Sequence, residues 1–111
     1  MSQLADWVAK ITADRQIALT LGGDHSIAIG SIFGHAQSCP DLVVMWVDAH
    51  ADLNTPLSST SGNIHGMSLS FVIKEMQRYA PRLPGFEWCQ PWSVVLLVRF
   101  VMTRVWSRAQ L

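Results

Sequence analysis

The chain has 111 residues, half of them hydrophobic, and carries eight basic and eight acidic side chains. This length is enough for one small globular domain, and the hydrophobic content excludes a disordered tail. Because nucleic-acid binding needs a basic face to neutralise phosphates, the zero net charge argues against it.

Strand and helix patterns alternate along the first half of the chain. A short amphipathic helix ending near Asp14 is predicted by apolar residues at helical spacing, namely Leu4, Trp7, Val8 and Ile11. Residues 17–21 are a compact apolar run before two glycines, which predicts a buried strand entering a tight turn. Residues 26–36 are again helical in pattern. Residues 42–47, apolar on both faces, predict a central parallel strand, and a right-handed strand-helix-strand unit places the chain in the α/β class.

The second half begins with a long polar loop. Residues 54–63 offer hydroxyl and amide groups without charge. Loops at the carboxyl ends of parallel strands are where open α/β sheets bind ligands, so this loop is a candidate binding segment. A helical pattern then runs from Gly66 to Tyr79 and ends before the breakers Pro81, Pro84 and Gly85.

The end of the second predicted strand carries three metal-binding side chains at alternate positions. If the backbone stays extended, Asp48, His50 and Asp52 point the same way and share one small volume. No Lys or Arg lies between Gln16 and Ile73, so a bound cation would offset the repulsion of these carboxylates. A distant arginine such as Arg78, folded back onto them, is the alternative.

His25 follows the first predicted strand just as Asp48 follows the second. Neighbouring parallel strands bring such ends together, so we expect His25 to join the same site. A histidine at this position can also be a helix N-terminal residue bound to a backbone carbonyl, but the neighbouring Asp-x-His-x-Asp pattern favours a ligand. Asp24 is assigned to a helix cap or to support of a ligand, and His35 to the surface or to packing.

Carboxylates mixed with imidazoles, without thiolates, favour Mn, Fe or Zn, and an oxygen-rich set favours Mn. Asp48, between two histidines, can bridge two ions, and two adjacent ions lower the pKa of a shared water enough for hydrolysis at neutral pH. A dinucleotide-binding turn is the competing interpretation of a strand, a glycine turn and a helix. Residues 22–25 lack the required glycine spacing and put an acid where a pyrophosphate would lie.

Three segments closely resemble the arginases of the ureohydrolase family: LGGDHS at 21–26, VDAHADLNTP at 47–56 and TSGNIHG at 60–66. The resemblance extends from about Leu4 to about Pro91. The second and third segments are closer to arginase than to agmatinase or the more distant deacetylases. The resemblance implies a three-layer α/β/α fold with a parallel sheet, and a binuclear manganese enzyme that hydrolyses L-arginine to L-ornithine and urea.

The resemblance also implies roles for single residues. His25, Asp48 and Asp52 match ligands of one manganese, and Asp48 and His50 match ligands of the other. His65 matches the catalytic histidine proposed to shuttle protons. The substrate-binding residues that it implies are His50, Asp52, Asn54, Ser61 and Asn63.

Some parts of the family pattern have no match. Glu87 is the last acidic residue, so a later Asp-x-Asp ligand pair and the glutamate that meets the guanidinium are not present in the 111 residues. We therefore expect residues 1–91 to be a partial arginase-like metal-binding domain that holds at most one Mn²⁺. The alternative to an active arginase is a non-catalytic metal-binding or interaction fragment.

Residues 92–111 leave the family pattern and are interpreted as a divergent tail. Its arginines could share one side of a basic amphipathic helix on a membrane, but we favour an ending without a partner in the sheet. Membrane binding is thus not expected. The first residues do not resemble a secretory signal, and Cys39 and Cys89 have no metal or redox spacing. We expect a cytoplasmic or mitochondrial protein that is not secreted, and homo-oligomers in the full-length family.

Overall fold

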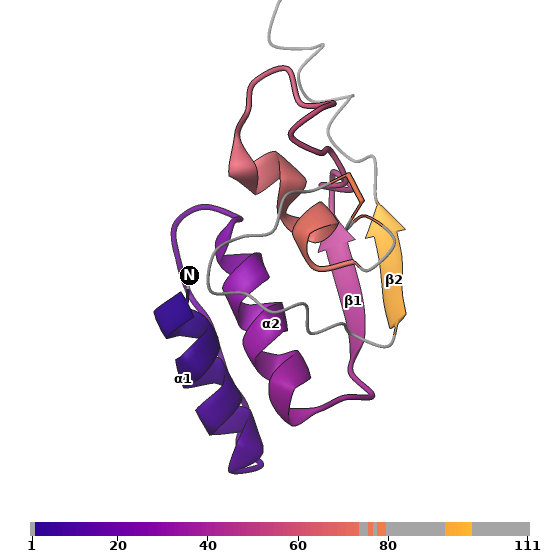
Figure 1. Cartoon of the computed structure of the whole chain (residues 1–111). Coiled ribbons are helices and arrows are strands. Elements are labelled where there is room, and N and C mark those ends of the chain that lie inside the picture. Colours follow the sequence, from indigo (N-terminus) through magenta and orange to yellow (C-terminus); the bar gives the residue numbers. More distant parts are fainter. Residues whose placement is uncertain (1, 74–75, 77, 80–92, 99–111) are drawn as a thin grey trace, which may run out of the picture.

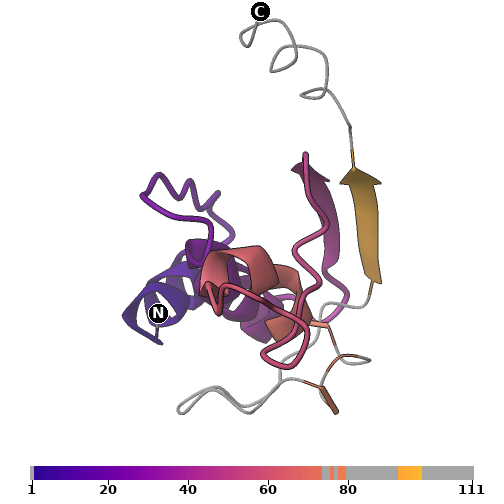
Figure 2. The ribbon, with the colours of Figure 1, turned by 90° about the horizontal axis from the view of Figure 1, so that it is seen from above.

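The computed structural model describes residues 2–73, 76, 78–79 and 93–98, the last segment by its backbone alone. Along these residues the elements are α1 (Ser2–Ala13), α2 (Ile27–Ser38), β1 (Val43–Asp48), the 3-10 helix η1 (Ile64–Phe71) and β2 (Ser93–Val98). Figures 1 and 2 show α2 between α1 and the strands, with the described helices on one side of the sheet. None of these helices has the length and apolar content needed to cross a bilayer.

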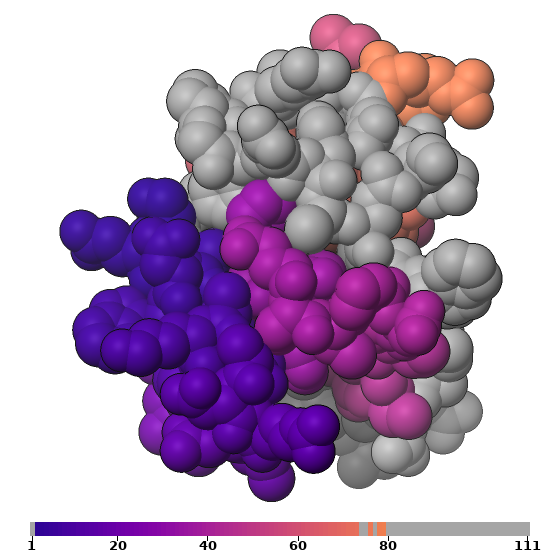
Figure 3. Space-filling view, turned by 60° about the horizontal axis from the view of Figure 1, so that its bottom comes forward, coloured from indigo at the N-terminus to yellow at the C-terminus, as the bar shows by residue number. Residues whose placement is uncertain are grey.

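The two predicted helices are confirmed, and they pack very closely. α1 buries Ala5 and Val8, and a Cβ atom added at Gly34 of α2 would lie 2.3 Å from the Ala5 carbonyl oxygen. Only glycine permits this approach. In the space-filling view the atoms of α1 and α2 meet along a continuous seam (Figure 3). The hydroxyls of Thr12 and Ser38 add a hydrogen bond between the two helices.

α1 ends in a turn whose backbone enters the left-handed region. Arg15 has a φ of 58°, and the N–H groups of Arg15 and Gln16 donate to the carbonyls of Thr12 and Ile11. This pair of bonds is the Schellman arrangement, which satisfies carbonyls at a helix end and normally favours glycine at the left-handed position. The chain therefore leaves α1 through a well-defined turn.

β1 confirms the strand predicted at residues 42–47, and its partner is β2. The strands are parallel, in a register that runs from Val43 opposite Ser93 to Asp48 opposite Val98. The expectation that the tail has no partner in the sheet is therefore wrong for Ser93–Val98. Loss of the family pattern does not exclude pairing, because strand pairing needs only an apolar segment that can reach an open strand edge. Trp92 and residues 99–111 lie outside the described residues.

β1 is covered on one face only, which corrects the prediction of a strand buried on both faces. Trp46 is 5% exposed, whereas Val43, Met45 and Val47 on the other face are 57–71% exposed. Successive side chains of a strand point to opposite faces, so one row meets the helices and the other meets solvent. The core cluster comprises Ile29, Trp46, Met67, Leu69, Phe71 and Val72.

The strand predicted at residues 17–21 is absent from the structure. Ile17, Leu19 and Leu21 are 80–95% exposed, and the segment has no regular secondary structure. A strand needs a neighbour for its backbone groups. In the described part of the chain β1 pairs with β2, and no strand pairs with residues 17–21. An apolar run alone is therefore not enough to form a strand.

The helix predicted at residues 66–79 is shorter and tighter than expected. η1 spans Ile64–Phe71, and the N–H groups of Leu69 and Ser70 donate to the carbonyl of Asp52 instead of continuing an α-helical ladder. Single turns follow at Ile73, Met76 and Tyr79. The predicted end of this helix at Pro81, Pro84 and Gly85 lies outside the described residues. η1 is thereby tied to the loop that follows β1.

Candidate metal centre

Asp48 is the last residue of β1, and its two carboxylate oxygens have different neighbours. Oδ1 accepts a hydrogen bond from the backbone N–H of His50 at 2.9 Å, which turns the chain away from the strand direction. Oδ2 lies 3.3 Å from Nδ1 of His25. One carboxylate oxygen at the end of β1 thus contacts a second segment of the chain, the one that carries His25.

His25 lies in the turn that leads into α2. The carboxylate of Asp24 accepts a hydrogen bond from the Ser26 N–H at 2.7 Å, which fixes this turn. Hydrogen bonds from Ser26, through its hydroxyl and its backbone N–H, hold the pKa of Asp24 below its usual value. As predicted, Asp24 supports the turn and is not part of the carboxylate pair around His25. The buried hydroxyl of Ser68 lies 3.1 Å from the carbonyl oxygens of both His25 and His65, so its O–H is shared between this turn and η1 and ties the two together.

Asp52 has a backbone conformation that few side chains tolerate. Its φ is 49°, in the left-handed region, where aspartate is accepted more readily than most residues. The N–H groups of Leu69 and Ser70, 3.1 and 3.3 Å away, donate to its carbonyl and hold this conformation. The side chain is 8% exposed, and its Oδ2 lies 2.7 Å from Nδ1 of His25.

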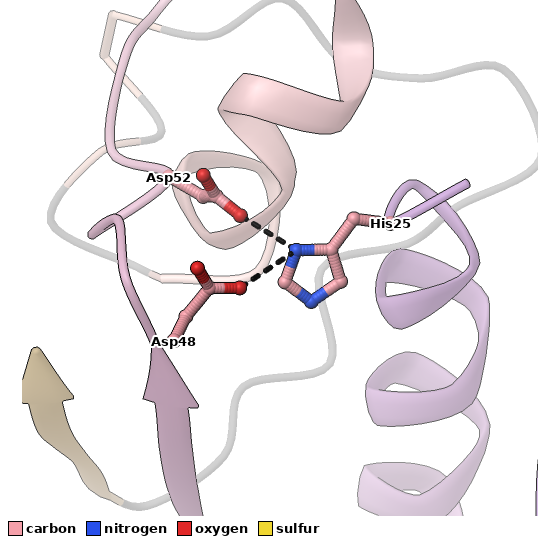
Figure 4. Close-up of side chains that lie close together, drawn as sticks. All are labelled: His25, Asp48 and Asp52. Carbon is pink, nitrogen blue, oxygen red and sulfur yellow. Dashed lines mark ion pairs between the residues drawn. The ribbon is translucent and has the colours of Figure 1, made fainter. Parts of the chain in front are cut away.

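The three side chains of His25, Asp48 and Asp52 point toward one another, with the imidazole nitrogen facing both carboxylates (Figure 4). One donor atom from each lies within 4.8 Å of the others. Metal ions of the first transition row bind nitrogen and oxygen at about 2.0–2.2 Å, so adjacent ligand atoms lie about 3 Å apart. The distances of 2.7 and 3.3 Å fit that spacing, and two hard carboxylates with one imidazole fit a divalent cation such as Mn²⁺.

The positive charge that would compensate these carboxylates does not come from Arg78. Its guanidinium lies 5.3 Å above the ring of Tyr79, and the residue is exposed. Among the residues that the structure describes, the ion-pair partners of Asp48 and Asp52 are histidines. A cation between the carboxylates therefore remains the favourable way to offset their repulsion.

His50 does not join the three converging side chains. Its side chain is 82% exposed, and its Nδ1 lies 3.6 Å from Oδ1 of Asp48. The prediction that alternate positions 48, 50 and 52 point the same way assumed an extended backbone. The turn at Asp48 and the left-handed Asp52 break that alternation. Asp48 nevertheless has one oxygen toward each histidine, Oδ2 toward His25 and Oδ1 toward His50.

A cavity of about 800 Å³ opens beside Asp52. Some of the remaining candidate residues line it, and others do not. Its lining consists of Ala49, His50, Ala51, Asp52, Leu53, Asn54, His65 and Gly66. The side-chain oxygen of Asn54 accepts a hydrogen bond from the hydroxyl of Ser58 at 3.3 Å. Ser61 and Asn63 are exposed and are not among the lining residues. The hydroxyl of Ser61 accepts a hydrogen bond from the Asn63 N–H at 3.3 Å.

Sequence reasoning missed two residues that contact the centre. Trp46 stacks its ring on the His25 imidazole with 4.7 Å between ring centroids. Its place two residues before Asp48 on the same face of a strand was a signal that could have been used. Ser68 carried no such signal, because its bond to the His25 carbonyl joins residues 43 positions apart.

With this geometry in place, the relatives of the chain are informative. The sequence model of the Arginase family matches residues 1–83. The chain belongs to the arginase family. It is 60% identical over 89 residues to "Arginase-1" of Oryctolagus cuniculus and 56% identical over 89 residues to "Arginase-2, mitochondrial" of Homo sapiens. Each match covers 80% of this chain, but the chain spans only 28% and 25% of those relatives.

Solved arginase structures have the same fold. The crystal structure of arginase from Bacillus cereus matches with a TM-score of 0.70 and 42% identity, over 86% of this chain and 33% of that chain. The cold-adapted arginase from the psychrophilic yeast Glaciozyma antarctica matches with a TM-score of 0.76 and 36% identity, over 86% and 35%. These matches confirm the predicted arginase-like α/β fold, of which this chain is a fragment.

Proposed function

We propose that the chain carries one part of an arginase active site, the part that holds the first of two manganese ions. The reaction would be the hydrolysis of L-arginine to L-ornithine and urea. The observation that carries this proposal is the convergence of His25, Asp48 and Asp52 within 4.8 Å, in a chain of the arginase family. One similar structure is that of the arginase of Entamoeba histolytica in complex with L-ornithine, which supports the substrate class.

In this proposal His25, Asp48 and Asp52 would hold one manganese, and Asp48 and His50 would contribute to holding a second. The contacts of the Asp48 carboxylate with both histidines support a role for Asp48 toward both ions. When bound, manganese supplies Lewis-acid polarisation and lowers the pKa of a water molecule. The protein's own task is to keep two carboxylates and one imidazole aimed at a common point before any ion arrives.

The substrate would lie in the cavity beside Asp52. His50, Asp52 and Asn54 line it, and His65 lines it from η1, at a position from which it could carry a proton to or from the reacting groups. Ser61 and Asn63 would meet the α-amino and α-carboxylate end of L-arginine from the polar loop. Their exposed, uncharged groups suit such contacts without competing for the metal.

For the 111-residue polypeptide by itself we propose metal binding without turnover. Within the described residues three donor side chains surround one point, which is enough for one ion and too few for a pair. A non-catalytic metal-binding fragment is therefore the second candidate function. For its location, cytoplasm or mitochondria remains the proposal, supported by the name of the mitochondrial human relative.

A chimera tests the proposed function most sharply. The matching residues of the rabbit arginase-1 relative are replaced by the 89 matching residues of this chain, and manganese-dependent urea release from L-arginine is measured. We expect activity in the chimera and its loss in the same chimera carrying Asp48→Ala. Asp41→Ala, at an exposed acid just before β1, is the matched control and should retain activity. A folded chimera that releases no urea would contradict the proposal.

A further inference from the structure

Trp46 contacts the candidate metal centre through His25. It is on β1 two residues before Asp48, and its side chain is on the covered face of the sheet with 5% exposure. Its indole and the His25 imidazole are 4.7 Å apart between centroids, with 28° between their planes. The same ring therefore belongs to the hydrophobic core and packs against the imidazole of His25.

Apart from this stack, the His25 ring is held through Nδ1, which lies 3.3 Å from Asp48 Oδ2 and 2.7 Å from Asp52 Oδ2. The side chain is 40% exposed, and the hydrogen bond from Ser68 reaches the backbone carbonyl, not the imidazole. An exposed imidazole on a turn would rotate about its side-chain torsions, and ordering it on metal binding would cost entropy. The stack on a buried indole restricts the plane of the ring in advance, and the contacts of Nδ1 with Asp48 and Asp52 restrict which edge of the ring faces the carboxylates.

The indole nitrogen indicates that the ring face, not the polar group, is what matters here. Nε1 of Trp46 is buried and has no hydrogen-bond partner among the residues that the structure describes. An unsatisfied buried donor lowers stability, and the contact with His25 is made by the stacked rings and not by a hydrogen bond from the N–H. A phenyl ring at this position would keep an aromatic face without the unsatisfied donor.

We propose that Trp46 is a positioning residue, which fixes the His25 imidazole by stacking so that Nδ1 is aimed at the carboxylates of Asp48 and Asp52. This inference rests on the proposed function for the part that concerns metal affinity. The orientation of the ring is a property of the metal-free chain and stands by itself. Residues that orient a metal-binding histidine typically change metal affinity by about 10–100-fold when they are replaced.

The test compares the full 111-residue chain with Trp46→Phe and Trp46→Leu. In the metal-free state, nuclear Overhauser effects between the rings of residues 25 and 46, and the coupling constants of the His25 side chain, report the orientation. Paramagnetic resonance of free Mn²⁺ reports affinity. We expect wild type and W46F to show one His25 orientation and affinities within about twofold. W46L should show averaged orientations and at least about tenfold weaker binding.

Val8→Ala separates positioning from general loss of stability, because Val8 is 4% exposed but lies in α1. This variant should be less stable with unchanged His25 orientation and metal affinity. If W46L does not fold, Trp46→Met replaces it. A nonaromatic variant that keeps the single His25 orientation, or that binds Mn²⁺ as tightly as wild type, overturns the inference. So does a wild-type chain without ring-to-ring effects. If the wild-type chain binds no Mn²⁺ at all, the proposed function fails and the orientation data alone decide the role of Trp46.

Discussion

Residues 17–21 and residues 43–47 are similar apolar runs, and each is followed by a segment that contributes to the candidate metal centre. Only the second is a strand. β1 pairs with β2 along its length and buries Trp46 against the helices, whereas Ile17, Leu19 and Leu21 are exposed, and no strand in the described part of the chain pairs with them. The difference shows that an apolar run becomes a strand only when another segment satisfies its backbone and covers one of its faces.

The side chains of His25, Asp48 and Asp52 converge even though residues 17–21, which precede His25, do not form a strand. His25 is held by the turn at Asp24 and by Ser68, and Asp52 is held by the N–H groups of η1. The bonds made by Ser68, Leu69 and Ser70 connect each of the two loops to η1. The geometry of the site therefore depends on the contacts between the loops and η1 more than on the regularity of the sheet.

The largest difference between the two apolar runs should appear when each loses a side chain. Trp46→Ala removes a buried ring from the core and should lower the free energy of unfolding by about 3–5 kcal/mol. Leu19→Ser removes a side chain that is 80% exposed and should change it by less than about 0.5 kcal/mol. Urea denaturation of both variants checks this. Equal losses would mean that residues 17–21 are packed in solution.

The close packing of α1 against α2 can be tested by replacing two glycines with alanine. Gly34→Ala puts a Cβ atom 2.3 Å from the Ala5 carbonyl oxygen, so we expect a loss of about 1–3 kcal/mol from overpacking. Gly23→Ala, between the exposed run and His25, meets no atom within 4 Å and should be nearly neutral. Thermal unfolding monitored by circular dichroism distinguishes them. A neutral Gly34→Ala would show that α1 and α2 are not in close contact.

Ser68→Ala tests the bond between η1 and the turn of His25. The hydroxyl is fully buried and donates to the carbonyls of His25 and His65, both 3.1 Å away, so its loss should cost about 1–2 kcal/mol. Backbone amide exchange around residues 24–26 should also increase. Ser61→Ala, at an exposed serine of the polar loop, is the control and should change neither quantity. Unaltered exchange in Ser68→Ala would show that the turn is held by other contacts.

The smallest effect concerns the turn through which the chain enters the exposed run. Arg15 has a φ of 58°, which glycine adopts without the strain of a Cβ atom. Arg15→Gly should therefore raise the free energy of unfolding by about 0.5–1 kcal/mol. Asp14→Gly, one residue earlier and without a positive φ, should not stabilise the chain. A destabilised Arg15→Gly would mean that the Arg15 side chain makes contacts that matter more than backbone strain.

The sequence predicted the meeting of His25, Asp48 and Asp52, because acidic and histidine residues after apolar runs indicate a shared edge of an α/β fold. It also predicted both α-helices from their periodicity. The left-handed Asp52, the outward His50 and the Trp46 stack were not predictable in this way, because each depends on contacts with η1 or on a turn that breaks the extended pattern. The pairing of Ser93–Val98 with β1 is likewise a long-range choice that local pattern does not specify.

The central claim is that His25, Asp48 and Asp52 form one manganese site in the 111-residue chain by itself. Titration of the 111-residue chain with Mn²⁺, followed by electron paramagnetic resonance, tests it directly when wild type, Asp52→Asn and the control Asp41→Asn are compared. We expect one bound ion in wild type and in Asp41→Asn, and none in Asp52→Asn, because the buried carboxylate is the partner nearest to His25. A spin-coupled pair of ions, a folded wild type without bound Mn²⁺, or undiminished binding in Asp52→Asn would contradict the account.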